Sequence, residues 1–156
     1  MLTIDLRYYF NPKSYIEEHG NYNLTTEARI IDEITQRDYS VIKYYKDEKI
    51  LDILIRYTAW YMITNFNKRV FFLTTSKERR KYFFDNVRKI ISESEIGIER
   101  DTVKSFETTA FNYLYADKYS LINSVNMNKE FIILDEFGHC DEYLNPFPYL
   151  TVTKKD

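Results

Sequence analysis

The chain contains little of three residue types that shape many small folds. Its single cysteine, Cys140, excludes an internal disulfide and any zinc site built from cysteines, and it is typical of a reducing compartment. Only three glycines and three prolines occur, and no glycine lies between Gly20 and Gly97. A glycine-rich loop of the kind that cradles phosphates is therefore excluded from that long interval.

Long apolar runs and an excess of one charge are also missing. No apolar run approaches the ~20 residues that a membrane-spanning helix needs, and the first ten residues lack the basic and then apolar layout of a secretion signal. The formal net charge of −2 argues against a surface built throughout to coat nucleic acid, although a local basic patch is compatible with it. We therefore expect a cytoplasmic protein without a membrane partner.

Aromatic and apolar residues are plentiful instead. Hydrophobic residues make up 44% of the 156 residues and charged residues 29%, which predicts a single folded domain with one core. The 15 tyrosines and 11 phenylalanines exceed what a core of this size readily hides. We therefore expect an exposed aromatic patch, and patches of this kind often mark protein contacts.

Hydrophobic patterning predicts strands that alternate with helices. The expected helices cover 11–20, a segment from about residue 25 or 26, 48–66, and 75 to about 92; the expected strands cover 39–45, 70–74, 102–107, 111–116 and 130–137. The strand at 70–74 is apolar throughout, as in a central strand covered on both faces. The helix at 48–66 is apolar around most of its circumference, which predicts burial on several sides. The order predicts an α/β fold with a three-layer, largely parallel central sheet flanked by helices.

The sharpest local signal is the segment 131–136, FIILDE. Four apolar residues predict a buried strand, and Asp135 and Glu136 follow at its carboxyl end, the edge where open α/β sheets bind ligands. In P-loop ATPases the first such acid helps to hold Mg²⁺, and the second orients the attacking water. A strand that ends in two solvated acids is the alternative that this motif alone leaves open.

Several stretches resemble the ATPase domain of the terminase large subunit, the DNA-packaging motor of phages and other viruses. They are YFNPKSYIEEHG at 9–20, the run from RYTAWY to VRKI at 56–90, and the run from YADKYS to DEYL at 115–144, so that the resemblance spans roughly residues 8–145. It implies a P-loop NTPase-like fold of the RecA/ASCE type and a viral protein within a host cell. It divides the single domain 1–156 into a helical lead-in (1–38), a P-loop-like core (39–145) and a proline-containing tail on the surface (146–156).

The sequence departs from the family at the phosphate-binding loop. Lys49 falls where the family has its lysine, but Lys43 and Glu48 replace the two glycines, and Ile50 replaces the hydroxyl residue. Without glycine the backbone cannot easily wrap phosphates, and Glu48 would repel a triphosphate. Only residues 137–156 follow the acids, so we expect neither the coupling motif nor the nuclease domain of the motor. ATP hydrolysis and a bound cofactor are not expected.

The preferred interpretation is a degenerate, terminase-like module that binds a partner instead of hydrolysing ATP. Its partner would be a host protein, a packaging component or DNA, and the module would act as a viral adaptor or inhibitor. One alternative is an atypical ATPase of a packaging machine, in which Lys49, Asp135 and Glu136 gather Mg-ATP and Asp135 holds the metal. Another is an unrelated α/β protein-interaction domain whose strand happens to end in two acids.

Three further groups of residues have simpler interpretations. Basic residues crowd the helix expected at 75–92, and we expect a solvated face, with DNA contact as the alternative through Lys77, Arg80, Lys81 and Arg88. The cluster at 139–142, HCDE, is interpreted as a loop, since adjacent residues rarely point at one centre, and a metal could be held only by its carboxylates. Tyr57, Trp60 and Tyr61 are interpreted as core residues.

Overall fold

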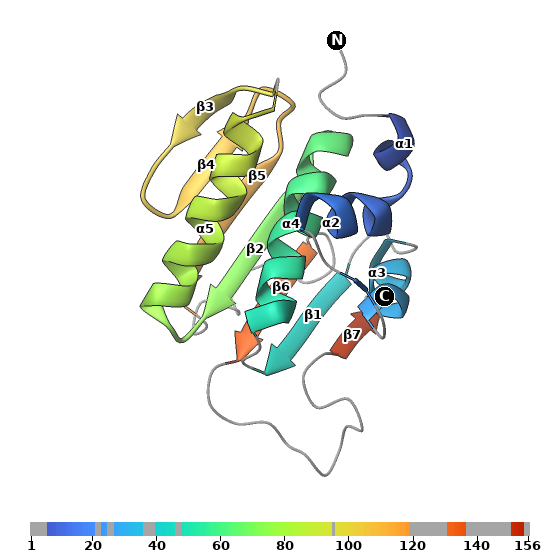
Figure 1. Cartoon of the computed structure of the whole chain (residues 1–156). Helices are drawn as coiled ribbons and strands as arrows, with labels where there is room; N and C mark the ends of the chain where they lie inside the picture. The colour runs from blue at the N-terminus through green and yellow to red at the C-terminus, as the bar shows by residue number, and fades with distance from the viewer. Residues whose placement is uncertain are drawn as a thin grey trace.

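A computed structural model describes residues 6–20, 23–24, 27–35, 40–45, 48–94, 96–118, 131–136 and 151–154. The helices are α1 (Leu6–Tyr9), α2 (Pro12–Gly20), α3 (Glu27–Thr35), α4 (Glu48–Thr64) and α5 (Lys77–Ser92). The strands are β1 (Ser40–Tyr45), β2 (Arg69–Thr74), β3 (Ile98–Asp101), β4 (Ser105–Thr108), β5 (Tyr113–Lys118), β6 (Phe131–Glu136) and β7 (Thr151–Lys154). Figure 1 shows how these elements form one α/β unit.

The seven strands form one mixed sheet in the order β3-β4-β5-β2-β6-β1-β7. The central strands β5, β2, β6 and β1 are parallel, whereas β3, β4 and β7 pair antiparallel with their neighbours. The expected α/β class is confirmed, but the sheet is mixed and not largely parallel. The strands at 40–45, 69–74 and 131–136 are parallel neighbours, with β6 between β1 and β2.

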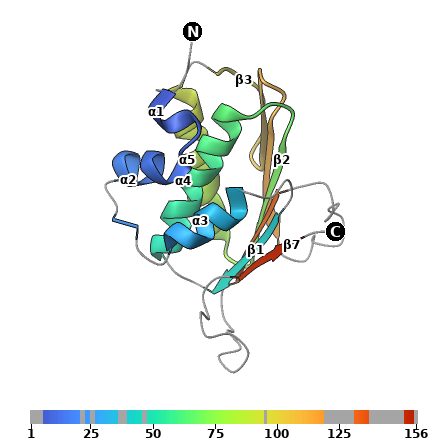
Figure 2. The ribbon, with the colours of Figure 1, turned by 90° about the vertical axis from the view of Figure 1, so that its right-hand side faces the viewer.

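All helices of the described segments cover one face of the sheet (Figure 2). A second helical layer, which the sequence led us to expect, is not found in the described part of the chain. On the face without helices Phe71, Leu73, Ile132 and Leu134 form a small buried cluster. Strands β2 and β6 are therefore apolar on both faces, as their uninterrupted hydrophobic sequences predicted.

Helix α4 lies at the centre of the larger core, where it packs on the sheet beside α5 and is covered by α2. Eleven of its residues are buried, which confirms the prediction of a helix covered on several sides. Tyr57 and Tyr61 pack on Phe131 of β6, with ring centroids 5.7 and 5.3 Å apart, respectively. The indole Nε1 of Trp60 donates to the carbonyl oxygen of Tyr8 at 2.8 Å. The core interpretation of these aromatic residues is confirmed.

Helix α5 begins and ends close to where the sequence predicted. Ser76 caps its first turn by accepting a hydrogen bond from the backbone N–H of Arg79, and the helix ends at Ser92. Of the apolar stripe that the sequence predicts to face inward, Phe83, Val87 and Ile91 are buried and Ile90 is half-buried. The ring of Phe83 stacks on Phe72 of β2 with centroids 3.9 Å apart.

The strands at both edges of the sheet differ from expectation. Strand β3 was not predicted, and β4 and β5 begin three and two residues later, respectively, than the expected segments 102–107 and 111–116. Residues 151–154 of the tail pair with β1, so this part of the tail extends the sheet. The two tail prolines lie outside the described residues. None of the described helices is long and apolar enough to cross a membrane.

Candidate functional site

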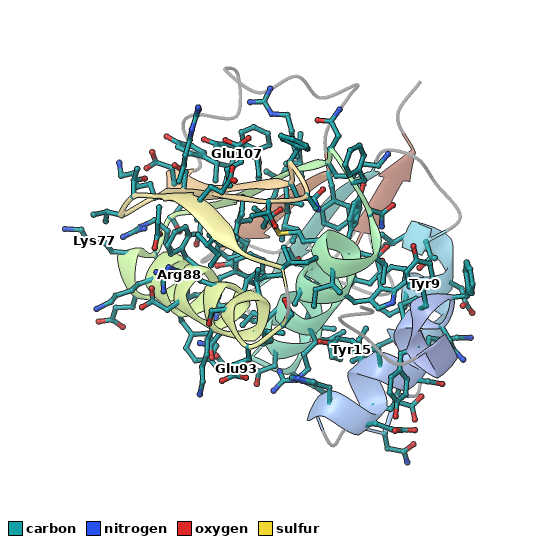
Figure 3. All side chains as sticks on the ribbon, turned by 90° about the horizontal axis from the view of Figure 1, so that it is seen from above. Tyr9, Tyr15, Lys77, Arg88, Glu93 and Glu107 are labelled. Atoms are coloured by element: carbon teal, nitrogen blue, oxygen red, sulfur yellow. The ribbon has the colours of Figure 1, made fainter. Side chains whose placement is uncertain are left out.

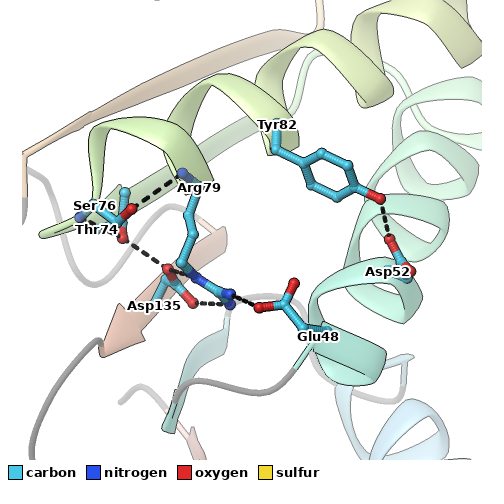
Figure 4. A network of polar contacts seen from close by, with 7 residues as sticks. All are labelled: Glu48, Asp52, Thr74, Ser76, Arg79, Tyr82 and Asp135. Carbon is cyan, nitrogen blue, oxygen red and sulfur yellow. Dashed lines mark hydrogen bonds and ion pairs between the residues drawn. The ribbon is translucent and has the colours of Figure 1, made fainter.

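Four polar side chains meet at the carboxyl end of the parallel strands (Figure 4). Asp135 lies near the end of β6, and Thr74 is the last residue of β2. Arg79 lies in the first turn of α5, and Glu48 is the first residue of α4, the helix that follows β1. The fold thus gathers these residues at the edge where α/β sheets commonly bind ligands.

The centre of this site is a buried ion pair between Arg79 and Asp135. The guanidinium Nε donates to Oδ2 of Asp135 at 2.7 Å, and Nη2 donates to Oδ1 at 2.8 Å. Asp135 is 0% exposed and Arg79 is 6% exposed. Paired, nearly parallel hydrogen bonds of this kind are the strongest form of arginine–carboxylate contact. Both oxygens of the carboxylate are therefore bound within the protein.

The chain between β2 and α5 folds around the same carboxylate. The hydroxyl of Thr74 donates to Oδ2 of Asp135 at 2.7 Å, and the backbone N–H of Ser76 donates to that hydroxyl at 3.1 Å. The Ser76 hydroxyl in turn caps Arg79. The cap of α5 and the ion pair therefore support each other, because the turn that starts the helix also fixes the guanidinium.

Glu48 adds a second acid to the same guanidinium. Its Oε1 accepts from Nη1 of Arg79 at 2.7 Å, but its side chain is 73% exposed, so that solvent screens this contact. The sequence predicted that Glu48 would repel a triphosphate at this edge. In the structure Glu48 also contacts the arginine that neutralises Asp135, which ties the start of α4 to α5.

Lys49 does not join the acids that the ATPase interpretation assigned to it. Its Nζ lies 3.2 Å from Oε1 of Glu27, the first residue of α3. Lys49 is thus engaged in linking α4 to α3, while Asp135 is held by Arg79. Glu136 ends strand β6, and its side chain lies outside what the structure describes.

Arg79 is the residue of this site that the sequence interpretation missed. It was grouped with the basic, solvated residues of the helix, and this assignment is wrong because the side chain is buried. A signal was present, since Arg79 precedes Phe83, Val87 and Ile91 at intervals of four residues. Positions at that spacing share one helix face, so an arginine in register with a buried stripe must find a buried acid.

The site has the features of a closed ion pair and not of an open metal centre. Among the described residues no group of three or more potential metal ligands occurs. A divalent ion at Asp135 would have to displace a guanidinium that makes two hydrogen bonds to the same carboxylate. Asp135 is also not the solvated acid of the alternative interpretation, because none of its surface is exposed.

The basic residues proposed for DNA contact have divided roles. Lys77 and Lys81 are exposed, whereas Nη1 of Arg80 donates to the carbonyl oxygen of Val103 at 3.3 Å. Arg88 pairs with Asp101 of β3, and the hydrogen bond that the guanidinium donates to this carboxylate raises the pKa of Arg88. Figure 3 shows Lys77 and Arg88 on α5. The HCDE cluster at 139–142 lies outside the described residues.

A polar hollow of about 150 Å³ lies between α2, α4 and α5, away from the ion pair of Arg79 and Asp135. Its wall includes His19, Asp52, Arg56, Tyr82 and Glu93. The Tyr82 hydroxyl donates to Oδ1 of Asp52 at 2.8 Å, and this bond raises the pKa of the phenol. Burial, and then the charge of Arg56, lower the pKa of His19. Acids and bases both line the wall, so the hollow favours no single ligand charge.

Comparison with known proteins adds no assignment to this geometry. The chain matches no protein-family model, and none of the curated proteins is significantly similar to it in sequence.

Proposed function

We propose that this chain is a non-catalytic, terminase-like P-loop module that acts by binding a protein partner. The observation that carries the proposal is the buried ion pair of Arg79 with Asp135. An ATPase needs the acid at this position for its metal ion, and here the acid is bound through both oxygens by an arginine of the same chain. The edge of the sheet is thereby given a structural role.

The position of Lys49 supports the same conclusion. A phosphate-binding lysine has to reach the terminal phosphates from the start of the helix, yet this lysine pairs with Glu27 of α3. Glu48 adds negative charge where a triphosphate would lie. The chain arrangement around β1, β6 and β2 supports the family resemblance, because these strands are parallel neighbours and helices α4 and α5 cover one face.

The resemblance itself is a separate part of the proposal. A viral adaptor or inhibitor that reuses the core of a packaging motor would keep this strand order while losing the phosphate loop. An unrelated α/β interaction domain would have the same closed site, and it would bind its partner equally well without nucleotide. Both versions predict binding without hydrolysis, so a single experiment separates them from the atypical ATPase.

Titration calorimetry with Mg-ATP tests the proposal. We expect no heat of binding from the wild-type chain. The ATPase alternative predicts binding that is lost in Lys49→Ala and in the double variant Arg79→Leu/Asp135→Leu, which removes both charges and keeps the site filled. Lys81→Ala, an exposed lysine elsewhere on α5, is the matched control. Saturable Mg-ATP binding that depends on Lys49 and Asp135, but not on Lys81, would overturn the non-catalytic function.

A further inference from the structure

Two phenylalanines are exposed at the opposite end of the sheet from Asp135. Phe66 lies in the turn between α4 and β2 and is 66% exposed, and Phe111 lies in the turn between β4 and β5 and is 55% exposed. Their rings meet edge to face with centroids 5.8 Å apart. Strands β2 and β5 are parallel neighbours, so both turns lie at their amino ends (Figure 1). The sequence predicted an exposed aromatic patch without locating it.

The backbone at this pair adopts a conformation that disfavours phenylalanine. Phe111 has a φ of 62°, and Asn67, next to Phe66, has a φ of 57°. The turn has three residues between Thr108 and Asn112, a type in which the third residue is left-handed and glycine is preferred. Asn67 suits such a position, whereas Phe111 does not. The turn alone does not explain an aromatic side chain at residue 111, and such local strain commonly marks functional positions.

The buried residue Asn112 holds the two turns together. Its Nδ2 donates to the carbonyl oxygens of Met62 and Asn65 at 2.7 and 2.9 Å, and its Oδ1 accepts from the backbone N–H of Lys68 at 2.8 Å. The backbone N–H of Asn67 also donates to the carbonyl oxygen of Ala110 at 3.1 Å. The phenylalanines are therefore presented on fixed backbone, which lowers the entropy cost of binding through them.

Two basic residues, Lys68 and Arg69, lie in the chain between Phe66 and the body of β2. Lys68 follows Phe66 in the same turn, and no described carboxylate forms an ion pair with its Nζ. Next to it the exposed Arg69 holds its guanidinium 5.4 Å from the ring centroid of Tyr113. The nearby acid Glu107, on β4, is paired with Arg100 at 3.8 Å. A binding surface that complements this one is apolar at its centre and acidic at its rim.

We propose that a protein partner binds to Phe66, Phe111, Lys68 and Arg69, here called the Phe66–Phe111 patch. The partner receives the two phenylalanine rings in an apolar pocket of its own that is bordered by aspartate or glutamate. This inference deepens the proposed function and rests on it, because it locates the surface through which the module binds. Exposed aromatic residues and arginine are enriched at protein interfaces. The net charge of −2 favours a protein over nucleic acid, whose phosphates a negatively charged protein repels.

Selection from a random library of phage-displayed peptides tests this surface. The bait is the wild-type chain, and the counter-selection uses the double variant Phe66→Ser/Phe111→Asn, in which asparagine tolerates the left-handed backbone. Val103→Ser is the matched control, because Val103 is 77% exposed in the turn between β3 and β4. Thermal unfolding of every variant is recorded, so that loss of binding is compared among folded proteins only.

We expect recovered peptides that carry an aromatic or aliphatic residue flanked by Asp or Glu. Their affinity should fall about tenfold or more in Phe66→Ser/Phe111→Asn, fall in Lys68→Glu, and stay unchanged in Val103→Ser. Failure to recover such peptides, or peptides that bind the double variant equally well, would overturn the patch and leave the proposed binding function standing. Oligothymidylate binding that depends on both phenylalanines would show a nucleic-acid surface instead. Mg-ATP binding, by contrast, bears on the proposed function alone.

Discussion

Arg79 and Asp135 lie 56 residues apart in the sequence, and two hydrogen bonds join them where β6 ends and α5 begins. Each charge is buried and compensated mainly by the other. The pair thus fixes the first turn of α5 against the centre of the sheet, at the edge where an enzyme of this architecture would bind its substrate.

Removing one partner of this pair should destabilise the fold strongly. Arg79→Ala leaves the Asp135 carboxylate buried without its cation, and we expect the free energy of unfolding to fall by about 3–5 kcal/mol. Urea denaturation followed by circular dichroism measures this loss. Arg80→Ala, one residue further along the helix, removes only a partly solvated contact and should cost less than about 1 kcal/mol.

The double variant Arg79→Leu/Asp135→Leu gives a sharper version of this test. Replacement of a buried ion pair by apolar residues is often neutral or stabilising, so the double variant should be more stable than either single variant. A double variant that loses the sum of the two single effects would contradict the coupling between the residues.

Asn112 should be a second position where a single substitution is costly. Asn112→Ala leaves the carbonyl oxygens of Met62 and Asn65 and the N–H of Lys68 without their partner. Leaving buried polar groups unsatisfied costs on the order of 1–3 kcal/mol, and we expect a loss toward the upper end of this range in a urea titration. Asn86→Ala is the matched control, because its side chain makes a single hydrogen bond at the surface of α5. Equal effects of the two substitutions would contradict the role of Asn112 in holding the two turns together.

Phe111 should be a position where losing a large side chain stabilises the protein. Asparagine adopts the left-handed conformation at φ 62° more readily than phenylalanine, for which such strain is worth roughly 1–2 kcal/mol. Phe111→Asn also gives up the edge-to-face contact with the exposed Phe66, which offsets part of the gain. We therefore expect a net rise of up to about 1 kcal/mol in the free energy of unfolding. A clear fall in the melting temperature would show that the ring stabilises the turn.

The sequence predicted those elements whose hydrophobic pattern is continuous. Strands β2 and β6 and helix α4 consist of long apolar runs, and their positions agree with the prediction to within a few residues. Strand β3 has one apolar residue and three charged ones, so that nothing in its own sequence indicates a strand, and it forms through its pairing with β4. Likewise β7 is defined by its pairing with β1 across more than a hundred residues.

The candidate site was predictable in position and not in chemistry. An acid at the carboxyl end of an apolar strand located the correct edge of the sheet through Asp135. The partner of this acid depends on which side of α5 faces the sheet, and the crowd of basic residues around Arg79 concealed that its position belongs to the buried stripe. Lys49 was placed correctly at the start of α4, but the contact with Glu27 depends on how α3 packs. Non-local packing thus determines which acid each basic residue pairs with.

His19 should make the stability depend on pH in a defined direction. Burial, and secondarily Arg56, lower the pKa of His19 below its ordinary value of 6.5, while Glu93 acts in the opposite direction. Near pH 6.5 the imidazole is therefore protonated in the unfolded chain while it is still neutral in the folded chain. Because the unfolded state binds more protons, the free energy of unfolding falls as the pH drops below that value. In His19→Gln this contribution is absent. From about pH 7.5 to about pH 5.5 the melting temperature of the wild-type protein should fall further than that of the variant. The acidic groups are common to both proteins and contribute equally. Titration of the imidazole by NMR provides the direct measurement: a pKa above 6.5 in the folded protein would reverse the sign and contradict the partial desolvation of the His19 ring.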